Sequence, residues 1–342
     1  MIKPGPRNLI TDVGGLLVGN AEDERVLTGV TVVLPDTDAV AAVELRGGAP
    51  CTRETDALDP SRLVETVHGV VLSGGSVYGL DAASGVVQWL GARGRGVSFR
   101  PGPPVAPVVP AGGLYDLANG GDKAWGDTPP YRSLGIAACE VAATDFRLGN
   151  AGAGIGAVAG AWKGGLGSAS VVCEGVTVGA LAAVNSYGSP VVPGTGALWA
   201  APFAIGDELG SSGFQPADVA TRSFERGTKA ELIAGNDGPG RNTTVAVVAT
   251  DARLTRSEAR RIAVMAADGM ARALRPVHSP YDGDVVFVLA TAGTELSGPR
   301  ARAITMIGSL AADTLARAIA RGVYEAASIA GWRSYRDAMD RG

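Results

Sequence analysis

The sequence predicts an α+β protein in which layers of β-sheet pack between layers of α-helix. Two observations lead to this prediction. The apolar segments with strand character fall into two groups along the chain, and each long helical segment carries a single apolar stripe to bury. Hydrophobic residues make up 46% of the 342 residues, which is ample for a large core. The 50 glycines follow no collagen period, so they indicate tight turns and close backbone contacts.

The first part of the chain opens with segments that we predict to form a run of antiparallel strands. A Gly-rich turn, Ser73-Gly74-Gly75-Ser76, then leads from a short strand into a helix. This turn lacks the lysine of a P-loop and the third glycine of a dinucleotide fingerprint, so we favour close backbone packing over phosphate binding. The expected elements are a strand, turn and strand at 8–19, strands at 28–34, 39–45 and 67–72, and helices at 77–90 and 132–144.

The second part of the chain alternates apolar strands with amphipathic helices. Thr255 and Glu258 form a capping box at the start of one helix, which ends before Pro276. Residues 205–241 are polar and irregular, and we expect them to form a long surface segment. The expected elements are strands at 169–173, 176–184, 245–250 and 285–290, and helices at 255–275 and 299–328.

The composition excludes several classes of function. A net charge of −4 argues against nucleic acid or an anionic membrane as the main partner. The only histidines are His68 and His278, and Cys51, Cys139 and Cys173 are widely spaced, so we expect reduced thiols and neither a metal nor a cofactor. The N-terminus has no apolar signal core, and glycines and charges interrupt every apolar run. The cytoplasm is therefore the expected location.

One junction in the sequence indicates chemistry. A Gly-rich segment at 235–240 meets a β-branched apolar strand at Asn242-Thr243-Thr244, which places a hydroxyl group on the first residue of a buried strand. If the Asn242–Thr243 bond were cut, Thr243 would carry both a nucleophile, Oγ, and a base, its own α-amine. The alternative is structural, with Asn242 as a turn residue and Thr243 as a β-former that begins the strand.

Several motifs follow one another in a specific order. They are Asn150-Ala151-Gly152-Ala153-Gly154, Lys163-Gly164-Gly165-Leu166-Gly167, Val184-Asn185, Asn242-Thr243-Thr244 and Pro280-Tyr281-Asp282-Gly283-Asp284. With these motifs, the chain from about Leu9 to Ala327 resembles the DmpA-type self-processing peptidases. That family includes β-peptidyl aminopeptidases, L-aminopeptidase/D-esterases and the nylon-oligomer endohydrolase.

The resemblance implies a four-layer αββα sandwich that is also seen in ornithine acetyltransferase-like proteins. It implies a single domain whose precursor is cut once, here into residues 1–242 and 243–342, with the two chains staying together. It further implies that these two-chain protomers assemble into a homotetramer.

The resemblance also implies roles for individual residues. Thr243 matches the nucleophile, and Asp282 and Asp284 match the pair that orients the freed amine and hydroxyl. A Thr with two Asp is the combination of the nylon-oligomer hydrolase, whereas the aminopeptidases tend to have Ser with Ser and Glu. Asn185 matches the side-chain donor for the oxyanion. Tyr115 matches a tyrosine beside the nucleophile, where it would contact the substrate.

Lys163 is the correspondence that depends on the alignment. A gap-free match from the small-residue run puts Ala161 at the place of the family's lysine, so Lys163 fills that place only if the chain is locally shorter. The alternative is a lysine that flanks a glycine turn. Two carboxylates as close as Asp282 and Asp284 need a cation to be fully ionised, and the ammonium group of Thr243 or of Lys163 is a candidate for it.

These features predict a self-processing N-terminal-threonine amidohydrolase that acts on small peptides or nylon-type aminohexanoate oligomers. The aminopeptidases of the family hold the substrate's free amine with an acidic group near the region that here spans residues 108–114, and this region contains no Glu. An aminopeptidase is therefore the first alternative. The others are an acyl transferase similar to ornithine acetyltransferase and an uncleaved, catalytically silent binding or scaffold protein.

We expect Asn242–Thr243 to be the only processing site, because there a flexible Gly-rich segment meets a buried strand at a hydroxyl residue. N-terminal sequencing of the smaller fragment should read Thr-Thr-Val-Ala. The Thr243→Ala variant should give one full-length band on denaturing electrophoresis and no activity. A fragment that starts at Thr244 or elsewhere would contradict the assignment.

Overall fold

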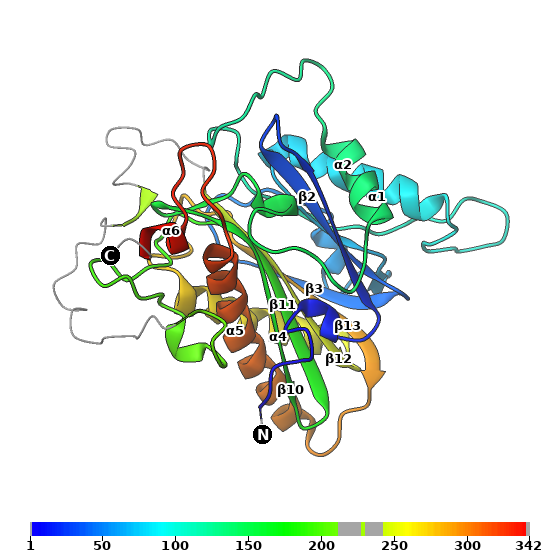
Figure 1. Cartoon of the computed structure of the whole chain (residues 1–342). Helices are drawn as coiled ribbons and strands as arrows, with labels where there is room; N and C mark the ends of the chain where they lie inside the picture. Colours follow the sequence, from blue (N-terminus) through cyan, green and yellow to red (C-terminus); the bar gives the residue numbers. More distant parts are fainter. Residues whose placement is uncertain (1, 211–226, 230–241, 340–342) are drawn as a thin grey trace.

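The computed structural model describes residues 2–210, 227–229 and 242–339, which form two β-sheets and a separate pair of short strands (Figure 1). The first sheet has the order β1-β2-β6-β7-β4, with strands Leu16–Asp23, Thr28–Pro35, Val70–Ser73, Ala111–Gly113 and Thr52–Arg53. The second has the order β10-β11-β12-β13-β3-β5, with strands Gly165–Cys173, Val176–Asn185, Thr243–Ala252, Val285–Thr294, Ala39–Leu45 and Thr66–Val67. The short pair is β8 (Val158–Ala159) and β9 (Trp162–Lys163).

The helices lie on the two outer faces of the sheets. Helices α1 (Ala82–Gly91) and α2 (Tyr131–Glu140) pack on the first sheet, and α4 (Arg256–Ala273) and α5 (Arg300–Tyr324) pack on the second. A third group of apolar side chains fills the space between the sheets. The layers therefore run helix, sheet, sheet, helix, which confirms the αββα sandwich. The short helices within the described residues are η1 (Ile10–Asp12), η2 (Asp56–Leu58), η3 (Ser76–Asp81), η4 (Gly152–Gly154), η5 (Ala201–Phe203) and α6 (Tyr335–Met339).

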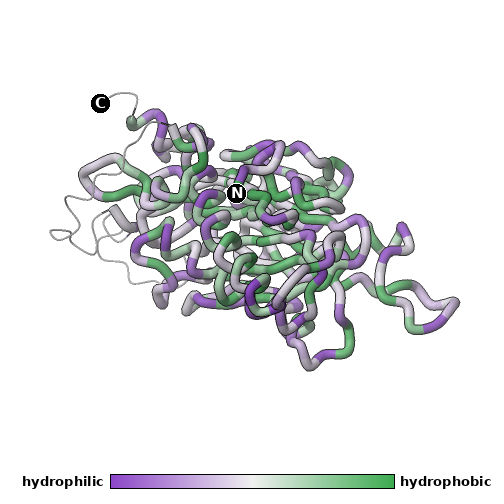
Figure 2. The backbone as a smooth tube through the Cα atoms, turned by 90° about the horizontal axis from the view of Figure 1, so that it is seen from below, coloured by the Kyte–Doolittle hydropathy of each residue, from purple (hydrophilic) through white to green (hydrophobic). Residues whose placement is uncertain are grey.

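Strand β12 is apolar along most of its length because both of its faces are buried. Val245, Val247 and Ala249 lie between the two sheets. Ala246 and Val248 lie on the opposite face, against α4 and α5. Figure 2 shows the same arrangement, with hydrophobic residues concentrated in the middle of the molecule and hydrophilic ones frequent in the outer loops. A strand covered on both sides has no solvated face, so the usual alternation of polar and apolar residues is absent.

Small residues allow α5 to lie directly on β10. A Cβ atom on Gly167 would lie 1.9 Å from the carbonyl oxygen of Ala318 and 2.2 Å from the backbone nitrogen of Gly322. No side chain fits at these distances, so glycine is required where the helix crosses the strand. The Lys163-Gly164-Gly165-Leu166-Gly167 motif therefore has a packing role in addition to any role in the site.

The turn at residues 73–76 binds a carboxylate of the protein itself. Gly75, with φ of +80°, donates its N–H to Asp116 Oδ1 over 2.8 Å. A Cβ atom on Gly74 would lie 2.2 Å from Asp116 Oδ2. The buried Asp116 side chain thus fills the space in which a phosphate would have to bind, in agreement with the packing interpretation of this turn.

The structure corrects the expected start of the chain. Residues 8–13 do not form a strand, because the Asp12 carboxylate accepts hydrogen bonds from the backbone N–H groups of Arg7 and Leu9 and folds this segment into the 3-10 turn η1. The first strands also do not form one antiparallel run. β1 and β2 pair in the first sheet, but β3 crosses to the second sheet and pairs with β13 and β5.

The expected helices occur with shifted ends. The helix expected from residue 77 begins as the 3-10 helix η3, and those expected to reach residues 144 and 328 end at Glu140 and Tyr324. The capping box is present, since Glu258 Oε2 accepts from the Thr255 N–H over 2.8 Å and Thr255 Oγ1 accepts from the Glu258 N–H over 3.3 Å. Most of the expected irregular segment at 205–241 lies outside the described residues.

Helix α5 is long and apolar enough to cross a membrane by length and composition, contrary to the expectation from the sequence. However, 78% of its apolar window is buried inside the fold. Ile307, Leu315 and Ile319 are fully covered and belong to the core between α5 and the second sheet. These contacts are those of a core helix.

Candidate active site

Thr243 is the first residue of β12 and lies between the ends of two other strands. It is opposite Asn185, the last residue of β11, in the antiparallel ladder. Its neighbour Asn242 forms a parallel bridge with Asp282, just before β13 begins. Each of these four residues is at most 4% exposed. Pairing of the three strands therefore brings together residues that are far apart in the sequence.

In the intact chain, the carbonyl oxygen of Asn242 accepts two hydrogen bonds. Thr243 Oγ1 donates to it over 2.5 Å, and the backbone N–H of Gly283 donates over 2.8 Å. A fixed N–H group at a carbonyl oxygen stabilises the negative charge that develops when the carbonyl carbon is attacked. Gly283 thus adds a donor that the sequence does not reveal, because any residue type except proline carries the same backbone N–H.

Asp282 is held by groups from two different segments. Its Oδ1 accepts from the Tyr187 N–H over 3.1 Å, and its Oδ2 accepts from the N–H and the hydroxyl of Ser279 over 2.9 and 2.7 Å. Burial raises the pKa of Asp282 to about 6, and the negative charge of Asp284 adds to the effect. A carboxyl group with this pKa can gain or lose a proton close to neutral pH.

Asp284 binds the residue that follows the nucleophile. Its Oδ1 accepts from the Thr244 N–H over 2.8 Å, and its Oδ2 accepts from the His278 N–H over 3.2 Å. His278 Nδ1 lies 2.9 Å from the same Oδ2, and this histidine has a φ of +54°. His278 belongs to none of the motifs that the sequence singles out, yet the structure places it in contact with the site.

Asn185 lies opposite Thr243, with its side chain hydrogen-bonded on both sides. Its Nδ2 donates to the carbonyl oxygen of Tyr115 over 3.0 Å. Its Oδ1 accepts from the Val158 N–H over 2.9 Å and from Asn119 Nδ2 over 3.1 Å. For Asn185 to donate to an oxyanion as expected, Nδ2 must either donate to the oxyanion and the Tyr115 carbonyl oxygen together or give up its bond to Tyr115. Tyr115 contacts this network through its backbone.

Lys163 lies at the end of β9 and is 1% exposed. Its ammonium group donates to the carbonyl oxygens of Gly154, Ala157 and Gly164 over 3.0, 2.9 and 2.6 Å. Burial lowers the pKa of Lys163 to about 7, and the negative charge of Asp116 partly opposes that effect. The contacts of Lys163 are therefore with the small-residue run, and the acidic residue whose charge acts on it is Asp116.

A second buried lysine, Lys229, does not belong to any motif that the sequence singles out. Its Nζ lies 3.3 Å from Oδ1 and 3.4 Å from the carbonyl oxygen of Asn185. Its backbone N–H donates to the carbonyl oxygen of Tyr187 over 3.1 Å. Burial lowers the pKa of Lys229 to about 7, and the negative charge of Asp282 opposes that effect. No sequence signal identifies this lysine, because it lies in a polar segment without periodicity.

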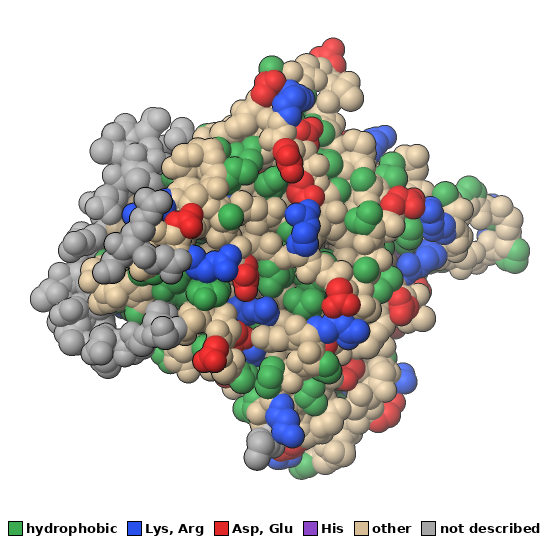
Figure 3. Space-filling model, viewed as in Figure 1, with side chains coloured by type: hydrophobic (Ala, Val, Ile, Leu, Met, Phe, Trp, Pro, Cys, Tyr) green, Lys and Arg blue, Asp and Glu red, His purple; other side chains and the backbone are tan. Residues whose placement is uncertain are grey.

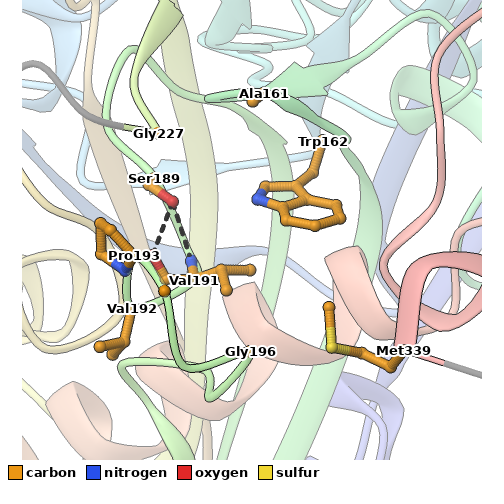
Figure 4. Close-up of a pocket in the computed structure, with 10 residues that line it drawn as sticks. Ala161, Trp162, Ser189, Val191, Val192, Pro193, Gly196, Gly227 and Met339 are labelled. Atoms are coloured by element: carbon orange, nitrogen blue, oxygen red, sulfur yellow. Dashed lines mark hydrogen bonds between the residues drawn. The ribbon is translucent and has the colours of Figure 1, made fainter. Parts of the chain in front are cut away.

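An apolar cavity of about 350 Å³ lies beside the backbone that carries both lysines (Figure 4). Trp162 precedes Lys163, and Gly227 lies two residues before Lys229. The hydroxyl of Ser189 donates to the carbonyl oxygen of Val191, so it does not make the cavity polar. The lining residues are Ala161, Trp162, Ser189, Val191, Val192, Pro193, Gly194, Gly196, Gly227 and Met339.

Comparison with known proteins decides the family. The model of peptidase family S58 matches residues 8–336, which is nearly the whole chain. The chain belongs to peptidase family S58. Members of this family are peptidases, so the protein is a hydrolase of peptide or amide bonds. The DmpA-type resemblance that the sequence motifs indicated is therefore confirmed.

Two kinds of relative are similar over most of their length. An uncharacterised aminopeptidase of Mycobacterium tuberculosis is 43% identical over 357 residues, which covers 96% of this chain and 97% of the relative. A 6-aminohexanoate-oligomer endohydrolase of a Kocuria species is 29% identical over 295 residues, which covers 84% of this chain and 76% of the relative. Both matches support hydrolysis of amide bonds by this S58 chain.

Solved structures show the same fold. A β-aminopeptidase of a Burkholderia species superposes with a TM-score of 0.67 at 22% identity, covering 100% of this chain and 96% of that one. The L-aminopeptidase D-Ala-esterase/amidase of Ochrobactrum anthropi, described as a variant of the Ntn hydrolase fold, superposes with a TM-score of 0.65 at 20% identity. It covers 95% of this chain and 88% of that one. At these identities, the likeness establishes the architecture alone.

The Gly283→Ala variant should accumulate as uncut precursor. A Cβ atom at this position would lie 2.6 Å from Thr243 Oγ1 and 2.7 Å from the carbonyl oxygen of Ala49, so the hydroxyl or the Gly283 N–H must move. Loss of one oxyanion donor slows a reaction roughly 10²–10³-fold, which denaturing electrophoresis over time would detect. Gly293→Ala on β13 is the matched control, because its Cβ would lie no closer than 3.8 Å to any group. Equal processing of both variants would exclude a role for Gly283.

Processing of the wild-type precursor should slow as the pH falls through about 6, because protonated Asp282 can no longer balance the positive charge that develops as the departing nitrogen takes up the hydroxyl proton. The rate is measured as the loss of the full-length band in buffers between about pH 5 and pH 8. Asp282→Asn should be slow at every pH and should lack this dependence. Asp127→Asn, a change at an exposed acid, serves as the control. An Asp282→Asn variant with wild-type rate and pH profile would remove Asp282 from the site.

Proposed function

We propose that the chain cleaves itself between Asn242 and Thr243 and then hydrolyses amide bonds with Thr243 as an N-terminal nucleophile. One observation carries the proposal. The Thr243 hydroxyl and the Gly283 N–H both contact the carbonyl oxygen of the bond to be cut, at the junction of three strands that also holds Asp282 and Asp284. Nucleophile, oxyanion donor and acids are the parts that acyl transfer requires.

Self-cleavage begins with attack of Thr243 Oγ1 on the carbonyl carbon of Asn242. The Oγ1–C bond forms, the Asn242–Thr243 C–N bond breaks, and the hydroxyl proton is transferred to the departing nitrogen, which becomes the α-amine of Thr243. Gly283 stabilises the oxyanion through the hydrogen bond already present in the intact chain. Water then hydrolyses the ester and leaves Asn242 with a free carboxylate.

The mature protein repeats this chemistry on its substrate. The α-amine of Thr243 takes the proton from Oγ1 as the oxygen attacks the substrate's amide carbon, and the proton then passes to the leaving amine. The acyl group remains on Oγ1 until water, activated by the same amine, releases it as a carboxylate. Asp284 keeps the backbone of Thr244 in place during both steps through its 2.8 Å hydrogen bond.

The substrate class follows from the residues around the nucleophile. Thr with two Asp is the combination associated with the nylon-oligomer hydrolases, and residues 108–114 contain no Glu to bind a substrate α-amine. The cavity beside Trp162 and Gly227 is lined with apolar groups, which suits an uncharged aliphatic chain. We propose linear amides, such as aminohexanoate oligomers or small peptides, as substrates. An aminopeptidase is the second candidate, and the 43% identity to an uncharacterised aminopeptidase favours it.

Two further properties belong to the same proposal. The self-cut protomer, made of residues 1–242 and 243–342, is expected to assemble into a homotetramer in the cytoplasm. On the face shown in Figure 3, acidic and basic side chains are interspersed between apolar and neutral ones. Such a mixed surface suits contacts with further copies of the chain better than contacts with a highly charged polymer.

An N-acetylated substrate separates the two candidate activities. We expect similar turnover of an aminohexanoate oligomer and of its N-acetylated form, because no acidic group is assigned to hold the free amine. Product release is measured by chromatography, with Thr243→Ala as the inactive control. If acetylation abolishes cleavage while dipeptides and amino-acid amides are hydrolysed well, the protein is an aminopeptidase.

A further inference from the structure

Lys229 is a buried charged residue to which the proposed reaction gives no role so far. It is 4% exposed and lies in the described segment 227–229, before the proposed cut. Moving an ammonium group out of water is costly unless nearby acceptors and an opposite charge compensate for it. Acceptors or an opposite charge near Lys229 must therefore compensate for its burial.

The contacts of Lys229 lead to the nucleophile and to one of the two aspartates. Its Nζ lies 3.3 Å from Asn185 Oδ1 and 3.4 Å from the Asn185 carbonyl oxygen, and Asn185 is paired with Thr243. Its backbone N–H donates to the Tyr187 carbonyl oxygen, and the N–H of Tyr187 donates to Asp282 Oδ1, each over 3.1 Å. The end of β11 is thus fixed between Lys229 on one side and Asp282 on the other.

Charge connects the same two residues. The negative charge of Asp282 raises the pKa of Lys229, against the larger opposite effect of burial. Such an interaction is mutual, so the ammonium group favours the ionised form of Asp282. Asp284 acts in the opposite sense, because its negative charge raises the pKa of Asp282. Among the described residues, His278, Tyr187, Tyr281 and Arg46 are further titratable or charged residues that contact the acidic pair or lie beside it, and cleavage would add the α-amine of Thr243.

We propose that Lys229 is a positioning residue of the active site, which holds Asn185 opposite Thr243 and keeps Asp282 ionised. The proposal deepens the function proposed above and rests on it. It also means that the chain before the cut contributes a cation to the site. Lys163 does not replace that cation, because its ammonium group is bound to three backbone carbonyl oxygens and Asp116 is the acid that acts on it.

The first test is the pH dependence of self-cleavage in Lys229→Met and Lys229→Arg. Loss of the positive charge should move the acid limb of the rate profile up by about one pH unit, the usual effect of removing one nearby opposite charge. The arginine variant keeps the charge and should keep the wild-type limb, with a lower rate because the larger side chain fits less well. Lys3→Met, an identical change at an exposed lysine, is the matched control. A Lys229→Met profile that coincides with the wild-type one, or an arginine variant that shifts equally, overturns the proposal.

The second test needs neither self-cleavage nor a substrate. The chain has only four lysines, Lys3, Lys123, Lys163 and Lys229, so a protein with ¹³C-labelled lysine side chains gives four resonances to follow by NMR. In the Thr243→Ala precursor, the resonance that disappears in Lys229→Met identifies Lys229. Adding Asp282→Asn should lower its titration midpoint by about one unit and leave that of Lys163 unchanged.

The two tests separate failure of this inference from failure of the proposed function. If Asp282→Asn leaves the titration of Lys229 unchanged, the two residues are not coupled and the inference is wrong, whatever the protein hydrolyses. If the coupling is present but the wild-type chain does not cleave itself, the positioning contact stands and the proposed reaction is wrong.

Discussion

Strand β12 is hydrogen-bonded to β11 along one edge and to β13 along the other, and this two-sided pairing fixes the position of its first residue. The antiparallel ladder places Asn185 opposite Thr243, and the parallel bridge places Asp282 beside Asn242. A hydroxyl on a loop would sample many positions, whereas one at the start of such a strand has few. The precise placement of the Asn242 carbonyl between Thr243 Oγ1 and the Gly283 N–H follows from these two ladders.

The site concentrates ionisable groups in a region that excludes water. Lys163, Lys229 and Asp282 are all buried, and their pKa values are shifted to between about 6 and about 7. Electrostatic interactions are stronger in such surroundings than in water, which helps a reaction that creates charge. The same burial makes the charged groups costly for folding, a cost that the proposed chemistry would account for.

A buried arginine joins the parts of the chain that the proposed cut would separate. Arg317 on α5 is 1% exposed and donates to both carboxylate oxygens of Glu208 over 2.6 and 2.7 Å. It also donates to Asn8 Oδ1 and to the Ser170 carbonyl oxygen over 2.8 and 3.0 Å. Residues before and after the cut also share the core between the second sheet and α5. These contacts explain how two chains could stay together once one peptide bond is lost.

The sequence by itself determined the class of fold, most of the strands and long helices, and the junction at Asn242-Thr243, because apolar periodicity and turn residues are local signals. It also determined the order of the motifs that led to the family. The tertiary structure alone decided that β3 crosses to the second sheet, that the Gly283 N–H contacts the Asn242 carbonyl, and that Lys229 lies against Asn185. The physical reason is that strand pairing, backbone donors and buried charges depend on residues distant in sequence, and a local pattern carries no record of those partners.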